Sequence, residues 1–424
     1  MQRWIIWTPM AAAALLLAYA LWPEAEQPPI RVGVLHSLTG TMAVSEKPVV
    51  DATLLAIDEI NAHGGLLGRK VEAVVADGGS DGPTFAREAE RLISEEHVAA
   101  IFGCWTSASR KQVKPVVERH HALLFYPVQY EGLEASPDII YLGAAPNQQI
   151  IPAVSWAIDR FGPRLYLIGS DYVFPRVAGW LIHRQALALG AEVVGERYLP
   201  LGSRDVAQAV AEIQRLAPSV VVNTINGDSN AAFFHALHQA GITATRTPVL
   251  SFSVGEATLA SLPDGEDAVG HYAAWNYFES IDSPANRTFV AAFRARYGAG
   301  RRVSDPMEAA WVGVHLWAQA VAAARSIDPQ IVRESVRHQS MMAPEGVVAI
   351  DHATGHAWRR VRIGRLTSAH RFEILWSSSN AVRPDPWPAL APRSAADSLL
   401  AALQRAWGGR WSAPPAAEGE MGRR

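Results

Sequence analysis

Short apolar runs alternate with helix-like segments along most of this chain, and this alternation restricts its fold more than any other feature. Residues 30–35 are typical of a buried strand, and apolar residues then recur at helical spacing over residues 50–57. Two more strands are expected at residues 71–75 and 98–102, with a helix between them. This pattern predicts an α/β protein in which helices cover parallel-rich sheets.

A second series of the same kind begins near residue 164. Strands are expected at residues 164–168, 192–198, 219–224 and 249–252, with helices between them. Later residues predict one more strand, helices at 284–297 and 306–324, and a hairpin-like pair at 361–365 and 372–376. Two βαβ series in one chain predict two lobes. We expect lobe 1 at residues 30–144 plus 273–345, and lobe 2 at residues 145–272 plus 346–378.

The first 29 residues have the features of an export signal. Arg3 supplies a short positive start, residues 4–22 are nearly free of charge, and Ala18 and Ala20 fit the small-residue spacing of a signal peptidase site. Because the apolar run is about long enough to span a bilayer, a retained membrane anchor is the alternative. Cleavage is favoured, since Thr8 and Pro9 interrupt the run.

Residues 379–424 are expected to form a proline-rich C-terminal extension that is partly disordered. Pro384, Pro386 and Pro388 lack backbone donors, so this stretch should run extended over the surface. Residues 398–407 have an amphipathic helical pattern, and residues 412–424 read as a disordered tail.

Composition excludes several kinds of function. A formal net charge of −3 gives no electrostatic reason to expect nucleic acid as a partner. The single cysteine, Cys104, excludes an internal disulfide and a multi-cysteine metal site, and we expect it to be a small buried residue. His120 and His121 lack a third ligand at suitable spacing, so no metal site and no cofactor are expected.

The motif GCWTSASRK at residues 103–111 follows an expected strand and opens an expected helix. Such a turn directs free backbone N–H groups and side-chain hydroxyls toward one point, which suits a small polar ligand. Ser107 is also a good helix N-cap, and as a lone residue that role would explain it.

Seven motifs in the same order resemble the urea- and amide-binding members of the type I periplasmic binding proteins, the solute receptors of ABC transporters. A cytoplasmic amide sensor of some bacteria is similar as well. The motifs are GVLHSLTGTMA (33–43), GCWTSASRK (103–111), YPVQYEG (126–132), APNQQ (145–149), GSDYVFPR (169–176), NTINGDSN (223–230) and DPMEAAW (305–311). The resemblance implies two Rossmann-like lobes, joined by three crossings, that close on a ligand at the carboxyl ends of the strands.

The resemblance also implies a set of ligand-pocket residues. These are Trp105, Ser107, Tyr126, Val128, Tyr172 and Phe174. Urea and short amides are neutral and planar, so a selective site needs donors, acceptors and flat walls. From their chemistry, Gln129, Asn226 and Asp228 can accept amide hydrogens, although Asp228 can equally cap the helix that follows it. Tyr126, Tyr172 and Phe174 can also be plain core aromatics.

The WTS (105–107) and PVQYEG (127–132) forms resemble those of urea receptors, which favours urea as the ligand, and three positions depart from the amide sensor. Trp105, Val128 and Phe174 stand where the amide sensor has a tyrosine, a threonine and a tyrosine, so three hydroxyls are lost. The sequence therefore predicts a periplasmic receptor that binds urea or a short-chain amide and delivers it to ABC transporter permease subunits. It would contact the membrane only through an uncleaved N-terminal segment.

Two other binding functions remain open, and an enzyme is disfavoured. A sensor that signals to a regulatory partner, such as a sensor kinase, shares the fold. A branched-chain amino-acid receptor does too, but it needs a cation for the ligand carboxylate, and Arg110 and Lys111 are expected to point away from the cleft. No Gly-x-Ser-x-Gly elbow, His-Glu-x-x-His or phosphate-binding loop is present, so no catalytic residue is assigned.

Overall fold

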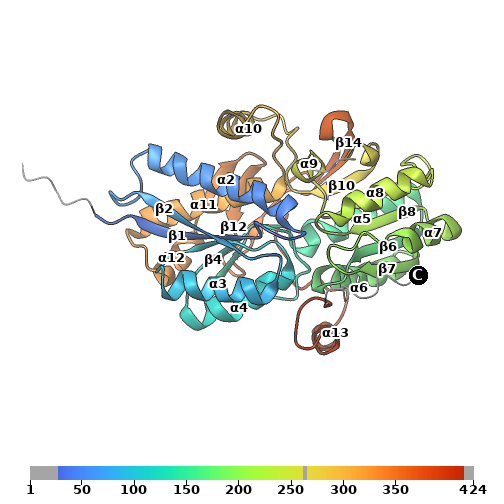
Figure 1. The fold of residues 1–424 in the computed structure, drawn as a ribbon, viewed down its shortest axis with the longest axis horizontal. Coiled ribbons are helices and arrows are strands. Elements are labelled where there is room, and N and C mark those ends of the chain that lie inside the picture. The colour runs from blue at the N-terminus through green and yellow to red at the C-terminus, as the bar shows by residue number, and fades with distance from the viewer. Residues whose placement is uncertain (1–26, 261–264, 415–424) are drawn as a thin grey trace, which may run out of the picture.

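The chain forms two α/β lobes that lie side by side (Figure 1). A computed structural model describes residues 27–260 and 265–414. The expected export signal or anchor falls almost wholly on residues 1–26, outside this range. In the described ranges no helix is both long and apolar enough to cross a membrane.

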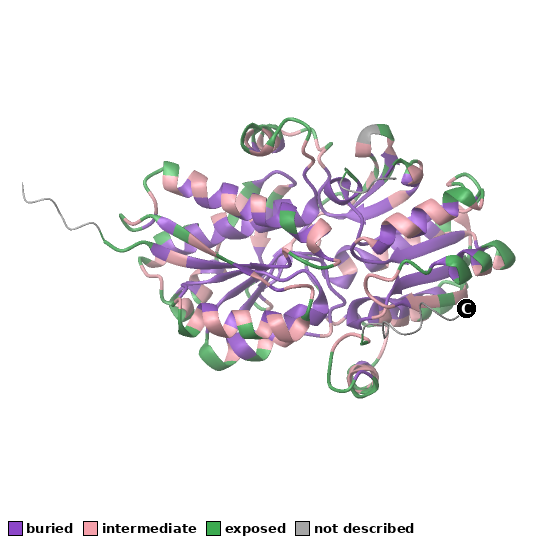
Figure 2. Ribbon diagram, viewed as in Figure 1, coloured by how far each residue is buried: buried purple, intermediate pink, exposed green. Residues whose placement is uncertain are grey.

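Lobe 1 is built on a five-stranded parallel sheet with the order β2-β1-β3-β4-β5. Its strands are β1 (Ile30–His36), β2 (Val71–Asp77), β3 (Ile101–Gly103), β4 (Leu124–Tyr126) and β5 (Ile139–Tyr141). The helices around this sheet are α2 (Ala43–Ala62), α3 (Gly82–Ser94), α4 (Ser107–His120), α10 (Pro284–Tyr297), α11 (Asp305–Ala324) and α12 (Pro329–Val336). Figure 2 shows that the other strands of this sheet are largely buried, while the edge strand β2 is partly exposed and the helices expose their outer faces.

Lobe 2 is built on a seven-stranded sheet with the order β15-β14-β10-β9-β8-β6-β7. The strands are β6 (Arg164–Ser170), β7 (Glu192–Leu199), β8 (Val220–Thr224), β9 (Val249–Ser251), β10 (Tyr272–Trp275), β14 (Arg362–Thr367) and β15 (Arg371–Ser377). The helices are α5 (Ile150–Phe161), α6 (Val173–Ala188), α7 (Ala207–Leu216), α8 (Ser229–Gln239) and the short α9 (Glu256–Ala260). β6 to β10 pair in parallel, and β14 and β15 form the expected antiparallel hairpin. The predicted α/β class with parallel-rich sheets is confirmed.

The chain passes between the lobes at positions that differ from the expected boundaries. Residues 273–275, expected in lobe 1, belong to β10 of the lobe 2 sheet. Residues 346–358, expected in lobe 2, hold β12 (Gly346–Ile350) and β13 (Ala357–Trp358), which join β11 (Ser340–Ala343) in a small sheet. Because Val348, Ile350 and Ala357 are buried in the apolar core beneath β1 and α11, this sheet belongs to lobe 1.

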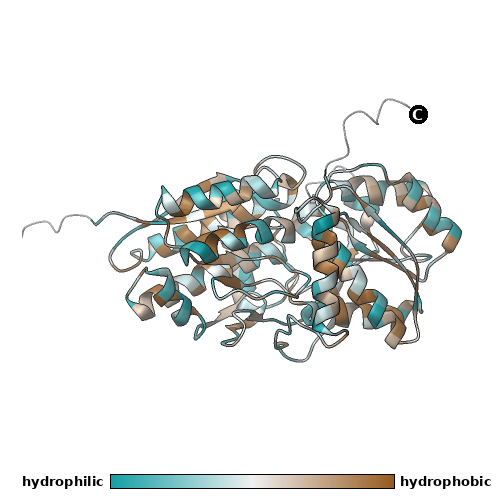
Figure 3. Cartoon of the chain, turned by 90° about the horizontal axis from the view of Figure 1, so that it is seen from below, coloured by the Kyte–Doolittle hydropathy of each residue, from teal (hydrophilic) through white to brown (hydrophobic). Residues whose placement is uncertain are grey.

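The C-terminal extension is more ordered than expected. Its proline-rich part is extended, but Pro384, Pro386 and Pro388 are buried, and the Leu133 N–H donates to the Pro386 carbonyl over 2.7 Å. The amphipathic helix is present as α13 (Arg393–Ala406), which contacts α6 and is seen from below in Figure 3. Part of the expected tail, residues 412–414, lies in the described range, and its backbone is paired at Ala413.

The three segments that cross between the lobes meet at a buried cluster of charges. Arg359 donates to the Leu142 carbonyl over 2.8 Å, and its guanidinium lies 2.7 Å from Glu308 and 2.9 Å from Glu345. Asp305 accepts the backbone N–H groups of Asn276 and Tyr277, at 2.9 and 2.8 Å.

The first crossing begins after β5 at Leu142, the second after β10 at Asn276, and the third after β13 at Arg359. These bonds therefore tie all three crossings to one site. Burial lowers the pKa of the Arg359 guanidinium, but the three carboxylates around it raise that pKa further, so the group stays charged. We call Arg359, Asp305, Glu308 and Glu345 the hinge cluster.

We predict that Arg359→Leu lowers the free energy of unfolding by about 3–5 kcal/mol, because it leaves buried carboxylates without their cation. Guanidinium chloride denaturation measures this, since urea is a candidate ligand. Arg365→Leu is the matched control: Arg365 lies six residues later, its partner is Glu373, and both side chains are about half exposed. Its expected cost is about 0–1 kcal/mol. Equal costs for the two variants would contradict the role of the hinge cluster.

The buried side chain of Glu256 should make the free energy of unfolding depend on pH. Its side chain is buried and accepts the Glu279 N–H over 2.9 Å. Burial, reinforced by the charges of Glu279 and Asp305, raises its pKa from 4.5 to about 8. The folded protein therefore keeps a proton that the unfolded chain releases between these values. The stability that this proton provides is present below pH 4.5 and is lost as pH rises to 8.

Glu256→Gln should remove this contribution, a slope of up to about 1.4 kcal/mol per pH unit. Unfolding free energies at pH 5, 6.5 and 8 test this. Burial also raises the pKa of Glu308, so part of the wild-type slope remains in the variant. The exposed Glu373→Gln should leave the wild-type slope unchanged, and a Glu256→Gln profile parallel to wild type would refute the assignment.

Candidate functional site

The motif at residues 103–111 forms a tight turn between β3 and α4 at the edge of lobe 1 that faces lobe 2. A side chain at Gly103 would place its Cβ 2.1 Å from the Leu35 carbonyl oxygen, so only glycine allows β1 and β3 to approach here. Cys104 follows in the left-handed region and is fully buried, as expected. Thr106 caps α4, accepting the Ser109 N–H over 3.0 Å. Ser107 is therefore not the cap, and its hydroxyl is free for other contacts.

Residues of both lobes meet at this edge. The Trp105 indole N–H donates to the Asn226 side-chain oxygen over 3.0 Å, and the Gln129 amide donates to the Phe252 carbonyl over 2.7 Å. Tyr126 supports the turn by donating its hydroxyl to the Trp105 carbonyl over 2.6 Å. All of these side chains are buried.

Tyr172 joins this group from lobe 2. Burial raises the pKa of Tyr172 well above the ordinary range, and the nearby Tyr126 and Glu131 raise it further. Arg110 and a hydrogen bond with Asn226 lower this pKa, but by less. Burial likewise raises the pKa of Tyr126. Both phenols therefore stay protonated at neutral pH and act as neutral hydrogen-bond donors. We call Trp105, Ser107, Tyr126, Gln129, Tyr172 and Asn226 the interlobe cluster.

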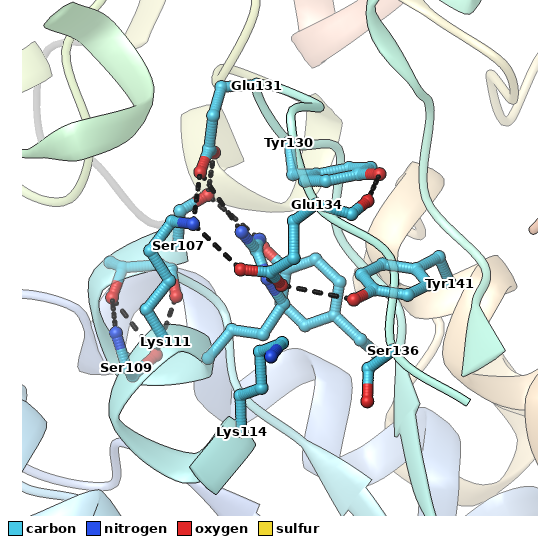
Figure 4. A network of polar contacts seen from close by, with 12 residues as sticks. Ser107, Ser109, Lys111, Lys114, Tyr130, Glu131, Glu134, Ser136 and Tyr141 are labelled. Atoms are coloured by element: carbon cyan, nitrogen blue, oxygen red, sulfur yellow. Dashed lines mark hydrogen bonds and ion pairs between the residues drawn. The ribbon is translucent and has the colours of Figure 1, made fainter. Parts of the chain in front are cut away.

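Ser107 belongs to a buried network of charges, shown in Figure 4. Its hydroxyl hydrogen-bonds with the Glu131 carboxylate and accepts from Arg110 over 3.0 Å. Glu134 lies 2.9 Å from Arg110 and 2.7 Å from Lys111, and Glu131 lies 3.1 Å from Arg110. Burial would raise the pKa of Glu134, but Lys111 and Arg110 hold it well below its usual range. Two cations and two carboxylates thus neutralise one another.

The expectation that Arg110 points away from the cleft is wrong. Arg110 lies one helical turn after Ser107 on the same face of α4, and its guanidinium is 4.8 Å from the centre of the Tyr126 ring. Sequence reasoning missed Glu131 and Glu134, the partners that hold it there. The signal was present, because both carboxylates lie in or directly after the YPVQYEG motif and match the charges of Arg110 and Lys111.

The remaining three candidate residues lie around the interlobe cluster rather than within its hydrogen bonds. Val128 is buried in the lobe 1 core, and Phe174 is buried in the lobe 2 core with its ring centre 6.3 Å from that of Tyr172. Asp228 is at the N-cap of α8, but its side chain makes no capping bond. It hydrogen-bonds with Thr41 of lobe 1 and is about one-third exposed, so it joins the lobes at the rim.

Two neighbouring cavities lie between the lobes, and Tyr172 lines the inner one. The inner one has a volume of about 20 Å³, room for about one water molecule, and its polar lining includes Ser37, Glu46, Thr106 and Ser109. Glu46 is buried, and it accepts the Ser37 N–H over 2.8 Å and contacts the His36 ring over 3.0 Å. Sequence reasoning did not single out Ser37 or Glu46, although the GVLHSLTGTMA motif contains Ser37. The outer cavity has a volume of about 230 Å³ and opens to solvent.

The site has the composition of a small-molecule binding site. Among the described residues, no group of three or more His, Cys, Asp and Glu side chains is arranged to hold a metal ion. Neutral donors and acceptors from two lobes converge on one place, and the charges behind them are paired. Such an arrangement can hold a small polar molecule between the lobes.

Comparisons with known proteins agree with this picture. The chain is 24% identical over 352 residues to Leu/Ile/Val-binding protein homolog 6 of Brucella melitensis. The aligned region covers 80% of this chain and 88% of that protein. A shorter match, 32% identical over 119 residues, joins it to limonene hydroxylase of Geobacillus stearothermophilus, but covers 28% of this chain and 22% of that protein.

Two solved structures share the fold. One is an ABC transporter solute-binding protein from R. palustris in complex with 4-hydroxybenzoate, with a TM-score of 0.74 and 22% identity, covering 85% of this chain and 99% of that one. The other is a branched-chain amino acid transporter substrate-binding protein from Streptococcus pneumoniae in complex with isoleucine, with a TM-score of 0.71 and 18% identity, covering 84% and 100%.

A family model described as "Periplasmic binding protein domain" matches residues 30–393, which include both sheets, the hinge cluster and the whole interlobe cluster. The chain therefore belongs to the periplasmic binding protein domain family.

Proposed function

We propose that this protein is an exported solute receptor that binds urea or a short-chain amide between its lobes and delivers it to an ABC transporter permease. One observation carries the choice of ligand. The interlobe cluster presents neutral donors and acceptors, while Arg110 and Lys111 behind it are already paired with Glu131 and Glu134. A neutral ligand needs no counter-charge, so it suits this site.

The side chains of the cluster match the hydrogen-bonding groups of an amide. The Tyr172 hydroxyl can donate to its carbonyl oxygen. The hydroxyl hydrogens of Ser107 and Tyr126 already go to Glu131 and to the Trp105 carbonyl, so these two hydroxyl oxygens can accept from its N–H groups. The Gln129 side-chain oxygen is buried and has no hydrogen-bond partner within the protein. An amide N–H of the ligand would supply that partner. The bond would be favourable, because a buried acceptor without a partner costs free energy. Trp105 and Phe174 offer flat apolar surfaces for a planar molecule, with Val128 nearby and Asp228 at the rim.

Binding would act through lobe closure. A ligand held by residues of both lobes stabilises the closed arrangement over the open one, and the transporter then recognises the closed form. The three crossings joined at the hinge cluster would let the lobes move as two bodies. No bond is made or broken in this cycle.

A branched-chain amino-acid receptor is the second candidate, and the similarity to the Brucella melitensis protein and to the isoleucine complex favours it. Such a ligand brings a carboxylate that must be neutralised on burial. Arg110 and Lys111 could serve only by giving up Glu131 or Glu134, which would leave a buried carboxylate unpaired. We therefore rank the neutral ligand first.

A thermal-shift series distinguishes these ligands. Urea, formamide or acetamide at one hundred times its dissociation constant should stabilise the protein by about 2.7 kcal/mol and raise its Tm. Urea should be kept at millimolar concentrations, below its denaturing range. Isoleucine and 4-hydroxybenzoate should give no shift, and a shift with either of these alone would overturn the proposal. Sustained ammonia release from urea or acetamide would overturn the binding-only role.

Ser107→Ala tests the site directly. Loss of this hydroxyl should weaken ligand binding about five- to thirtyfold, because one hydrogen bond to the ligand is worth about 1–2 kcal/mol. Isothermal titration calorimetry measures the affinity. Ser136→Ala is the matched control, since Ser136 is equally buried and donates to Glu118 over 2.7 Å, outside the cluster. Unchanged affinity in Ser107→Ala would remove Ser107 from the site.

A further inference from the structure

Residues 410–413, which we call the C-terminal strap, are attached to lobe 2 beside Tyr172. The Val173 N–H donates to the Trp411 carbonyl over 3.0 Å, and the Ala413 N–H donates to the Asp171 carbonyl over 2.9 Å. These two bonds pair Ser412 with Tyr172 in an antiparallel bridge. The strap is therefore fixed to the same short segment that places Tyr172 in the interlobe cluster.

The strap also reaches lobe 1. The Lys111 ammonium lies 4.8 Å from the centre of the Trp411 ring, within the range of a cation–π contact. All four strap residues line the outer cavity of about 230 Å³, whose opposite wall is formed by lobe 1 residues that include Ser80, Asp81 and Gln112. Ser412 lines the inner cavity as well, together with Tyr172. The strap thus lines the outer cavity along its whole length and reaches the inner cavity beside Tyr172 through Ser412.

An ordered helix holds the strap in this position. Trp407, just after the end of α13, is buried in the lobe 2 core, and three leucines of the helix pack on the same core. The family model ends at residue 393, where α13 begins, so the strap and nearly all of its supporting helix lie outside the matched domain.

We propose that the C-terminal strap is a lid on the ligand site, which slows ligand exchange and limits ligand size. The two contacts of the strap differ in kind. Two backbone hydrogen bonds hold it to lobe 2, whereas the face of Trp411 rests on Lys111 of lobe 1. When the lobes separate, the contact with lobe 1 must therefore break, and Trp411 moves away with lobe 2. The size limit rests on the proposed function, but the lid itself does not.

Cys104 provides a readout of opening that requires no ligand. It is the single cysteine of the chain, it is fully buried, and it lies next to Trp105 in the turn that faces lobe 2. A small thiol reagent such as methyl methanethiosulfonate can reach it only when the structure opens. The labelling rate of Cys104 therefore reports how often this region becomes accessible.

Trp411→Ala should raise the Cys104 labelling rate several-fold and should raise the release rate of radiolabelled urea by a similar factor. Trp411→Phe keeps an aromatic face and should restore most of the wild-type rates. Trp156→Ala is the matched control, because Trp156 is also partly buried in lobe 2, with Arg160 over its ring at 5.5 Å, but does not line the cleft. Guanidinium denaturation of each variant separates opening of the cleft from global unfolding.

The outcomes separate the lid from the ligand. If urea and the short amides do not bind while Trp411→Ala still speeds labelling of Cys104, the lid stands and the proposed ligand fails. If urea binds but Trp411→Ala changes neither rate, the lid is overturned and the proposed ligand stands. Equal acceleration by Trp156→Ala also overturns the lid, since the effect would then be general loss of stability.

Discussion

The relative position of the two lobes depends on the contacts of one buried cation. Arg359 lies on the third crossing and binds the first crossing through the Leu142 carbonyl. It also pairs with three buried carboxylates, those of Glu308, Glu345 and Asp305. Asp305 in turn binds the second crossing by accepting two of its backbone N–H groups. Crossing segments leave their sheets, so their backbone groups need partners elsewhere. The hinge cluster supplies these partners.

A second charged network sets the electrostatic character of the site. Arg110 and Lys111 stand directly behind Ser107, and in an amino-acid receptor such cations would be the natural partners of a carboxylate. Here Glu131 and Glu134 occupy them, and all four groups are buried. Because buried charges are costly to separate, the four groups stay paired, and the network presents no net charge to the site. Arg110 links this network to the site, because it donates to the Ser107 hydroxyl and lies over the Tyr126 ring.

The alternation of strands and helices was sufficient to predict the fold class, the two lobes and the β14–β15 hairpin, because each depends on local apolar periodicity. Features that depend on distant contacts were missed. Residues 346–358 look like ordinary strands, and only the burial of Val348 and Ile350 against the lobe 1 core places them there. Candidate residues came from motifs at strand ends, and the structure gathers six of the nine in one cluster. The orientation of Arg110 required knowledge of Glu131 and Glu134, which are more than twenty residues away.

The closed arrangement of the lobes also limits how tightly a ligand can bind. Trp105 already donates to Asn226, and the Gln129 amide to the Phe252 carbonyl, so the lobes satisfy much of each other's hydrogen-bonding capacity. A ligand that enters between them exchanges these bonds for its own, and only the difference contributes to affinity. The unpartnered oxygen of Gln129 is an exception, because a bond to it replaces nothing within the protein. For the amide ligand that we propose, selectivity should therefore come from an N–H directed at Gln129 rather than from the total number of polar contacts.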